Sequence, residues 1–137
     1  MHTLQRPRLA WPARLTVMLA ALMSLIGLVG VTPASASVYS SCTISRCADA
    51  RSADAIWESK GYPTTAGWYT WSGGKYNYTG GRFQNREGQL PSGGTYYEYD
   101  VYPRTRGAAR DAYRIVVNRS TGVTWFSPNH YTDFYRL

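Results

Sequence analysis

The chain has 137 residues, a formal net charge of +7 at pH 7 and an aromatic content of 15% that includes 12 tyrosines. This length suits one small domain and excludes an architecture of several full-sized domains. The excess of basic residues favours a polyanionic partner such as nucleic acid, although small basic toxins, inhibitors and wall-binding modules have a similar charge balance.

The first 36 residues are predicted to be an export signal. Arginines without any acidic residue precede an apolar run from 15 to 31, and Ala34-Ser35-Ala36 has the small residues of a signal cleavage site. The run is short for a membrane span, so a signal anchor is the weaker alternative. We therefore expect a secreted, extracellular domain over residues 37–137, without membrane attachment after cleavage. With 12 basic and 8 acidic residues, this domain has a net charge of about +4.

Two cysteines, Cys42 and Cys47, lie near the start of this domain. An oxidising compartment favours a disulfide between them. Closing so short a loop stabilises a fold by roughly 2 kcal/mol in the chain-entropy description. The pair lacks CxxC spacing, and two cysteines with one histidine make a poor metal site. We predict a structural disulfide and no bound metal.

A helix is predicted from residue 48 to residue 60, with Ala53, Ile56 and Trp57 on one face. Gly61 and a proline soon after it are typical of a helix end. The helix therefore offers a short apolar face to whatever element follows.

The next two segments are less regular. The aromatic segment 67–71, Gly-Trp-Tyr-Thr-Trp, is interpreted as core and surface packing, with an extension of a binding face as the alternative. Glycines and polar residues between 72 and 81 indicate loops.

A dense polar cluster comes just before the first clear strand. Guanine presents two N–H donors on one edge, and the Glu87 carboxylate can accept both. The O6 acceptor of guanine requires N–H donors, which the peptide groups around Asn85 and Arg86 can provide. Phe83 can stack on a base, as in single-stranded RNA readers. The alternative is a solvated turn in which Arg86 pairs with Glu87. The cluster consists of Phe83, Gln84, Asn85, Arg86 and Glu87.

Strand patterns dominate the second half of the chain. Apolar and polar residues alternate from 95 to 102, so Glu98 projects away from the more apolar set. Segments 114–117 and 123–126 are two further strands, and 133–137 is expected to be an edge strand. One helix followed by these strands predicts an α+β fold, with an N-terminal helix packed on a small antiparallel sheet.

His130 is the one histidine of the domain, and imidazole exchanges protons near neutral pH. Glu98 offers a carboxylate, and Arg110 and Arg114 offer permanent cations. Cleavage of RNA by its own 2′-hydroxyl needs a base, an acid and cations around the phosphoryl oxygens. We predict Glu98 as the base and His130 as the acid. Taken singly, each residue also fits a solvated charge or a satisfied core histidine.

The order of these residues is specific. Segment 83–91 reads Phe-Gln-Asn-Arg-Glu-Gly-Gln-Leu-Pro, and Glu98, an Arg-x-x-x-Arg-Ile pair beginning at Arg110, and His130-Tyr131 follow it. This order resembles the small secreted microbial guanyl-specific ribonucleases, the barnase-like group. The likeness runs from about residue 81 to the C-terminus.

The resemblance implies an endoribonuclease that cleaves single-stranded RNA 3′ of guanosine through a 2′,3′-cyclic phosphate, without metal or other cofactor. It gives Glu98 and His130 the base and acid roles and residues 84–87 the guanine site. Tyr131 is expected near the phosphate or the base. Arg110 and Arg114 are preferred as phosphate ligands because their spacing fits the family. Arg106 is a second candidate, as an RNA-backbone contact.

Further expectations come from the same resemblance. A producing cell would need a cytoplasmic protein inhibitor of the barstar kind, and we expect a monomer. Some members join the two ends of the chain by a disulfide, whereas Cys42 and Cys47 here form a local pair. The alternative function is a non-catalytic secreted aromatic-rich module that binds carbohydrate or nucleotides. Such a module has no need of the acid, base and arginines in this order.

Overall fold

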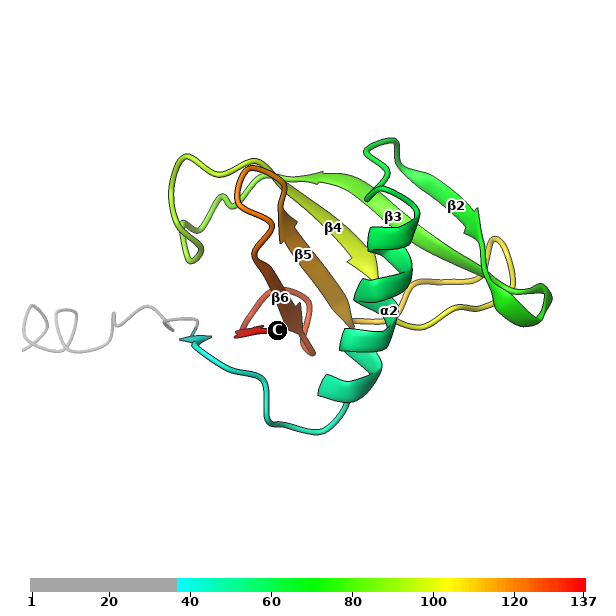
Figure 1. The fold of residues 1–137 in the computed structure, drawn as a ribbon, viewed down its shortest axis with the longest axis horizontal. Coiled ribbons are helices and arrows are strands. Elements are labelled where there is room, and N and C mark those ends of the chain that lie inside the picture. Colours follow the sequence, from blue (N-terminus) through cyan, green and yellow to red (C-terminus); the bar gives the residue numbers. More distant parts are fainter. Residues whose placement is uncertain (1–36) are drawn as a thin grey trace, which may run out of the picture. The chain divides into compact units, whose positions relative to one another are not determined.

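The computed structural model describes residues 37–137, so the expected export signal lies outside the described residues. One helix, α2 (Cys47–Ser59), crosses one face of a seven-stranded sheet (Figure 1). No helix in the described part is long and apolar enough to cross a membrane. The remaining elements are β1 (Val38–Tyr39), β2 (Gly67–Thr70), a 3₁₀ turn η1 (Ser72–Gly74), β3 (Tyr76–Phe83), β4 (Tyr96–Asp100), β5 (Arg114–Asn118), β6 (Thr124–Ser127) and β7 (Phe134–Arg136).

The α+β class is confirmed, but the sheet is larger than expected and mixed rather than antiparallel. Its strand order is β1-β7-β6-β5-β4-β3-β2, and β1 pairs with β7 in parallel. Segment 133–137 was expected at an edge, yet β1 covers β7 there. Because β1 precedes α2, the helix is not the first element of the fold. A strand of two residues, 38–39, is too short to show an alternating pattern. It could therefore not be predicted from the sequence.

Strand β3 corrects the expectation of loops between 72 and 81. Its inward residues are Asn77 and Thr79, both polar and both fully buried. Asn77 donates to the backbone carbonyls of Asp100 and Val101, and the Thr79 hydroxyl donates to the Glu98 carbonyl at 2.7 Å. Buried polar groups are tolerated when they are hydrogen-bonded. This segment lacks an apolar pattern, and it forms a strand because of its tertiary contacts to β4.

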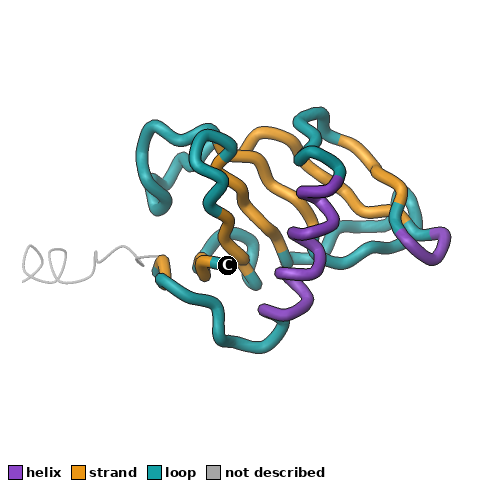
Figure 2. Tube along the Cα trace, in the orientation of Figure 1, coloured by secondary structure: helices purple, strands orange, loops and turns teal. Residues whose placement is uncertain are grey.

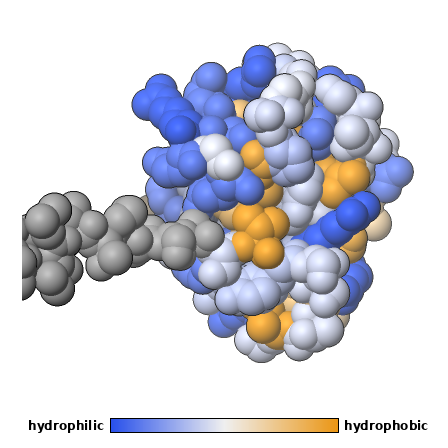
Figure 3. Space-filling view, turned by 90° about the vertical axis from the view of Figure 1, so that its left-hand side faces the viewer, coloured by the Kyte–Doolittle hydropathy of each residue, from blue (hydrophilic) through white to orange (hydrophobic). Residues whose placement is uncertain are grey.

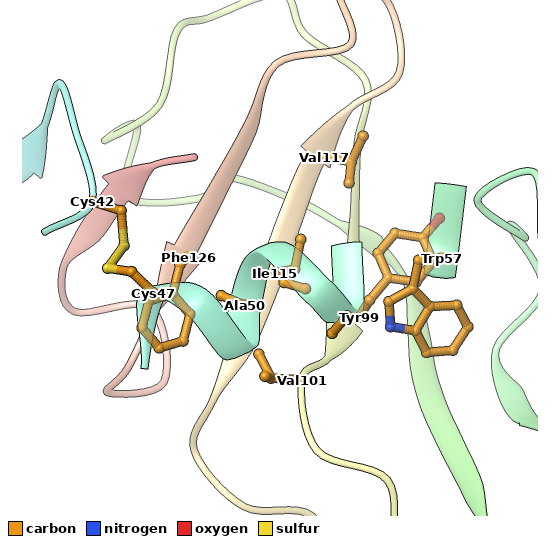
Figure 4. Packing of buried hydrophobic residues seen from close by; sticks show 10 residues of the cluster. Cys42, Cys47, Ala50, Trp57, Tyr99, Val101, Ile115, Val117 and Phe126 are labelled. Carbon is orange, nitrogen blue, oxygen red and sulfur yellow. A yellow bond between two sulfur atoms is a disulfide. The ribbon is translucent and has the colours of Figure 1, made fainter. Parts of the chain in front are cut away.

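Helix α2 lies one residue earlier than expected and packs on the sheet through Cys47, Ala50, Ala53 and Trp57. Ile56, expected on this face, is 37% exposed. The helix ends where Gly61 has a φ of 79°, and the N–H groups of Gly61 and Tyr62 donate to carbonyls of the last turn. Figure 4 shows the apolar cluster between helix and sheet, which includes Tyr99, Val101, Ile115, Val117 and Phe126. The predicted Cys42–Cys47 disulfide is present at its border.

The opposite face of the sheet is divided into two halves. One half is apolar and contains Tyr96, Val116 and Trp125 from β4, β5 and β6. The other half carries Glu98, Asp100 and Arg114, all nearly or fully buried. The long connections β3–β4 and β4–β5 contain no helix or named strand (Figure 2), and Leu90 of the first packs in the apolar half. The fold thus leaves a charged surface in the middle of a sheet, where packing alone would favour apolar side chains.

Candidate active site

Two carboxylates from β4 form the centre of the polar half. Glu98 and Asp100 are two residues apart in one strand, so both project from the face that α2 does not cover. Glu98 is 6% exposed and Asp100 is 0% exposed. Buried carboxylates are stable only when they are paired and hydrogen-bonded. The pairing here comes from arginines.

Arg110 reaches both carboxylates from the β4–β5 connection. Its Nη2 lies 2.6 Å from Glu98 Oε2 and 2.5 Å from Asp100 Oδ1, and its Nε donates to Asp100 at 3.1 Å. Burial alone would lower the pKa of the guanidinium, but the hydrogen bonds to Asp100 and Glu98 raise that pKa above its usual value. Arg110 is therefore a fixed, permanent cation beside the Glu98 carboxylate.

Arg114 approaches the same pair from β5, directly opposite Asp100 in the ladder. Its Nη1 lies 3.2 Å from Asp100 Oδ1 and 3.4 Å from Asp111 Oδ1. Its Nε lies 3.4 Å from Glu98 Oε2 and forms no hydrogen bond with any described residue. A buried donor without a partner is costly. The Nε–H is buried, and the nearest anion to it is the Glu98 carboxylate.

A cavity of about 390 Å³ opens next to these groups. It brings together Glu98, His130 and Tyr131 with the polar cluster that follows β3. Residues of strands β3 and β4 and of the β3–β4 and β6–β7 connections therefore share one pocket. Its lining consists of Arg82, Phe83, Gln84, Asn85, Arg86, Glu87, Glu98, His130 and Tyr131.

His130 is exposed at the pocket and held by its backbone. Its N–H donates to the Ala112 carbonyl at 2.9 Å, so the segment that carries Arg110 and Arg114 also fixes His130. His130 and Tyr131 both have positive φ, 53° and 70°, which is uncommon for residues other than glycine. The Tyr131 N–H donates to Ser127 Oγ at 2.9 Å. A constrained turn thus fixes the backbone that carries the imidazole at the pocket.

Tyr131 connects the imidazole to the carboxylate and to the apolar wall. Its ring centroid lies 4.8 Å from that of His130 and 4.8 Å from that of Phe83. Burial raises the pKa of the Tyr131 hydroxyl, and the neighbouring Glu98 carboxylate raises it further. The phenol therefore stays protonated beside Glu98 and keeps the pocket wall neutral there.

The loop after β3 is organised by Asn85, which has a φ of 53°. Its side chain donates to the Leu90 carbonyl at 2.9 Å and accepts from the Leu90 N–H at 3.2 Å. Neither the Arg86 nor the Glu87 N–H donates to a backbone carbonyl of the described residues. The Glu87 side chain is exposed. The end of the molecule that carries this loop is largely hydrophilic, and apolar side chains emerge there in separate spots (Figure 3).

The structure brings most of the predicted residues together and separates one of them. Arg106 is exposed and lies over the Tyr76 ring, 5.6 Å from its centroid, away from the pocket lining. The sequence reasoning missed Asp100, although its position two residues after Glu98 in a strand signals a shared face. It also missed Arg82 in the pocket lining and Arg104, which pairs with Asp100.

The fold and the pocket define a small α+β protein in which Glu98 of the sheet and His130 of the β6–β7 connection line one cavity. Arg110 and Arg114 are not part of this lining but lie against the Glu98 carboxylate. The chain belongs to the ribonuclease family, the microbial guanyl-specific group: the family model described as ribonuclease matches residues 32–137. It is therefore an RNA-cleaving enzyme of this family. No curated protein and no solved structure matches the chain significantly. Within residues 37–137, no three His, Cys, Asp or Glu side chains are arranged to hold a metal ion.

Gly80 supplies the space for the Glu98 carboxylate. A Cβ at position 80 would lie 1.6 Å from Glu98 Oε1. Gly80→Ala must therefore displace this carboxylate, and we expect kcat/KM for RNA to fall about 100-fold, the size of effect that a misplacement of 1 Å can have. Gly122→Ala is the control, because a Cβ there meets nothing within 4 Å although its φ of 81° strains the turn. It should lower stability and leave activity intact. Equal activity of both variants would contradict the assigned role of Gly80.

Proposed function

We propose that this protein is a secreted endoribonuclease that cleaves single-stranded RNA 3′ of guanosine. The observation that carries the proposal is the pocket in which Glu98 and His130 meet residues 83–87. In this proposal Glu98 accepts the proton of the 2′-hydroxyl as its oxygen bonds to phosphorus. His130 donates a proton to the departing 5′-oxygen as the P–O5′ bond breaks. The product is a 2′,3′-cyclic phosphate, which water opens with the two roles reversed.

Charge stabilisation belongs to Arg110 and Arg114 in this mechanism. Both guanidiniums already lie around the Glu98 carboxylate, and the Arg114 Nε lacks a hydrogen-bond partner among the described residues. Preorganised donors near the place where charge develops lower the barrier without reorganisation. A catalytic metal is not needed for such a mechanism. The contacts of Arg110 with both carboxylates favour it over Arg106 as the phosphate ligand.

Cleavage of short RNAs that contain one guanosine tests the proposal directly. We expect products that end in guanosine 2′,3′-cyclic phosphate and then 3′-phosphate, with the rate unchanged by EDTA. A DNA strand of the same sequence should remain intact because it lacks the attacking hydroxyl. Products with 5′-phosphate ends, or a rate abolished by EDTA, would refute the mechanism. An RNA zymogram beside a glycan pull-down separates this enzyme from a carbohydrate-binding module.

Guanine recognition is assigned to the Glu87 carboxylate and to the N–H groups of Arg86 and Glu87, which donate to no backbone carbonyl of residues 37–137. Glu87→Ala removes the acceptor for the guanine edge and should lower kcat/KM at guanosine by about 5- to 160-fold, since each good bidentate base contact discriminates by about 1–3 kcal/mol. Cleavage after adenosine should change little. The measurement compares two RNAs that differ only in this base. Unchanged selectivity would remove Glu87 from the recognition site.

Three further parts of the proposal concern the setting of the enzyme. Secretion follows from the expected export signal and from the frequent export of this family. A monomer is proposed, with a light-scattering mass of one chain as its test. A cytoplasmic inhibitor would protect the producing cell. Expression of residues 37–137 without the signal should then be toxic unless such an inhibitor is present, and toxicity should be lost with His130→Ala.

A further inference from the structure

A row of aromatic and arginine side chains continues the charged face beyond Arg110, toward the edge of the sheet. Trp68 of β2 and Tyr78 of β3 are paired in the ladder and touch edge-to-face, with ring centroids 5.1 Å apart. We call this row the aromatic–arginine strip. It consists of Trp68, Tyr76, Tyr78, Arg104 and Arg106.

The strip lies on the same face as Glu98 and not on the helix face. Neighbouring residues in the strands settle this, because Tyr69 contacts Trp57 of α2 and Asn77 is buried under the helix side. Alternation then sends Trp68 and Tyr78 to the opposite face. Both remain partly exposed. Helix packing therefore does not explain why two large aromatic residues stand there.

The strip is continuous with the active site through one side chain. The Arg110 guanidinium donates to Glu98 at 2.6 Å and lies over the Tyr78 ring, 4.6 Å from its centroid. Arg104 repeats this arrangement, since it pairs with Asp100 and lies 5.4 Å from the Trp68 centroid. A phosphate held by Arg110 would thus have an aromatic ring immediately beside it.

The charge of the strip suits a polyanion. Asp100 is fully buried and forms ion pairs with three arginines. Arg106 is exposed, lies over Tyr76 and forms no ion pair with any described residue. Alternating aromatic rings and guanidiniums are the means by which proteins bind single-stranded nucleic acid without reading its sequence. A carbohydrate would use the rings but not the surplus positive charge.

We propose that the aromatic–arginine strip binds the RNA nucleotides 3′ of the scissile phosphate, with a base stacked on Trp68. The inference rests on the proposed function and adds the direction in which the RNA strand crosses the site. The guanine loop follows the C-terminal end of β3, whereas the strip lies along β2 and the N-terminal half of β3, on the other side of Glu98 and Arg110. Because the recognised guanosine is 5′ of the cut, the strand that leaves in the opposite direction is the 3′ side.

Three RNAs with one guanosine each test the strip: a GpU dinucleotide, the same dinucleotide with three uridines added at the 3′ end, and one with three uridines added at the 5′ end. We expect the wild-type protein to cleave the 3′-extended RNA with a kcat/KM roughly 5- to 100-fold above that of GpU, the range expected for stacking of one base. The 5′ extension should add little. Trp68→Ala should lose the gain and cleave GpU, which lacks the added nucleotides, at close to the wild-type rate.

Two variants keep this result interpretable. Trp68→Phe retains a stacking ring and should recover part of the gain, which a merely structural role would not predict. Tyr39→Ala removes an exposed aromatic residue of β1, outside the strip, and should keep the full gain. A gain that survives in Trp68→Ala, or that follows the 5′ extension, would overturn the inference. Failure of the proposed function looks different, because GpU itself would then not yield the guanosine cyclic phosphate.

Discussion

Glu98→Gln and His130→Ala should each lower kcat for RNA cleavage by about 100- to 10,000-fold, the usual contribution of one positioned acid or base. Glutamine keeps the size of Glu98 and can still accept from Arg110 but cannot take the 2′-hydroxyl proton. Alanine at 130 removes the proton donor from an exposed position, so the fold should not suffer. Initial rates at saturating RNA, with circular dichroism as a check on folding, measure both effects.

The pH profiles of these variants distinguish the two roles. A base that must be ionised limits the rate at low pH, and an acid that must be protonated limits it at high pH. The low-pH decline should therefore disappear in Glu98→Gln, and the high-pH decline should disappear in His130→Ala. His130→Ala should also retain its thermal stability. Near-normal turnover in both variants would remove this pair from the mechanism. If both variants lost the same one of the two declines, the assignment of Glu98 as base and His130 as acid would be wrong.

Local chemistry explains which parts of the fold were predictable. Helix α2 has a clear C-terminal signal at Gly61, β4 lies in a segment of alternating residues, and β5 and β6 contain short runs of β-branched or aromatic residues, so sequence alone locates these elements. Strand β3 was missed because its buried positions, Asn77 and Thr79, are polar and become acceptable only through β4 carbonyls. The parallel pairing of β1 with β7 joins residues almost one hundred positions apart. Such pairing leaves no trace in a short window of sequence.

The candidate site also has parts that the sequence predicts and parts that it does not. Segment 83–91 and the residues Glu98 and His130 form a motif, so their proximity was predictable. The choice between Arg106 and Arg110 was not, because it depends on how the connection from 101 to 113 crosses the face. The structure directs Arg110 onto the carboxylates and Arg106 onto Tyr76. Likewise, no pattern signals that Gly80 must be glycine, since the reason is the position of a side chain on the neighbouring strand.

Asp100 is expected to be the most important residue for stability in this part of the protein. It is fully buried and contacts Arg104, Arg110 and Arg114. Asp100→Asn keeps the shape but leaves these cations without their common anion. Removal of one partner from a buried ion pair typically costs about 3–5 kcal/mol of unfolding free energy. Urea unfolding should detect this loss. Asp111→Asn is the matched control, since its side chain is 34% exposed and touches Arg114 at 3.4 Å. It should cost about 1 kcal/mol or less.

Phosphate provides the test that separates electrostatic loss from a packing defect in Asp100→Asn. When Asp100 is replaced by Asn, Glu98 is the anion that remains at the centre of the arginines. The site therefore becomes more positive. Inorganic phosphate should then bind more tightly to Asp100→Asn than to the wild-type protein. Because a ligand that binds only the native state raises stability, phosphate should increase the melting temperature of the variant more than that of the wild type. An equal increase in both proteins would mean that Asp100 acts through packing. A larger increase in the variant would mean that the aspartate balances the phosphate-binding arginines when no RNA is bound.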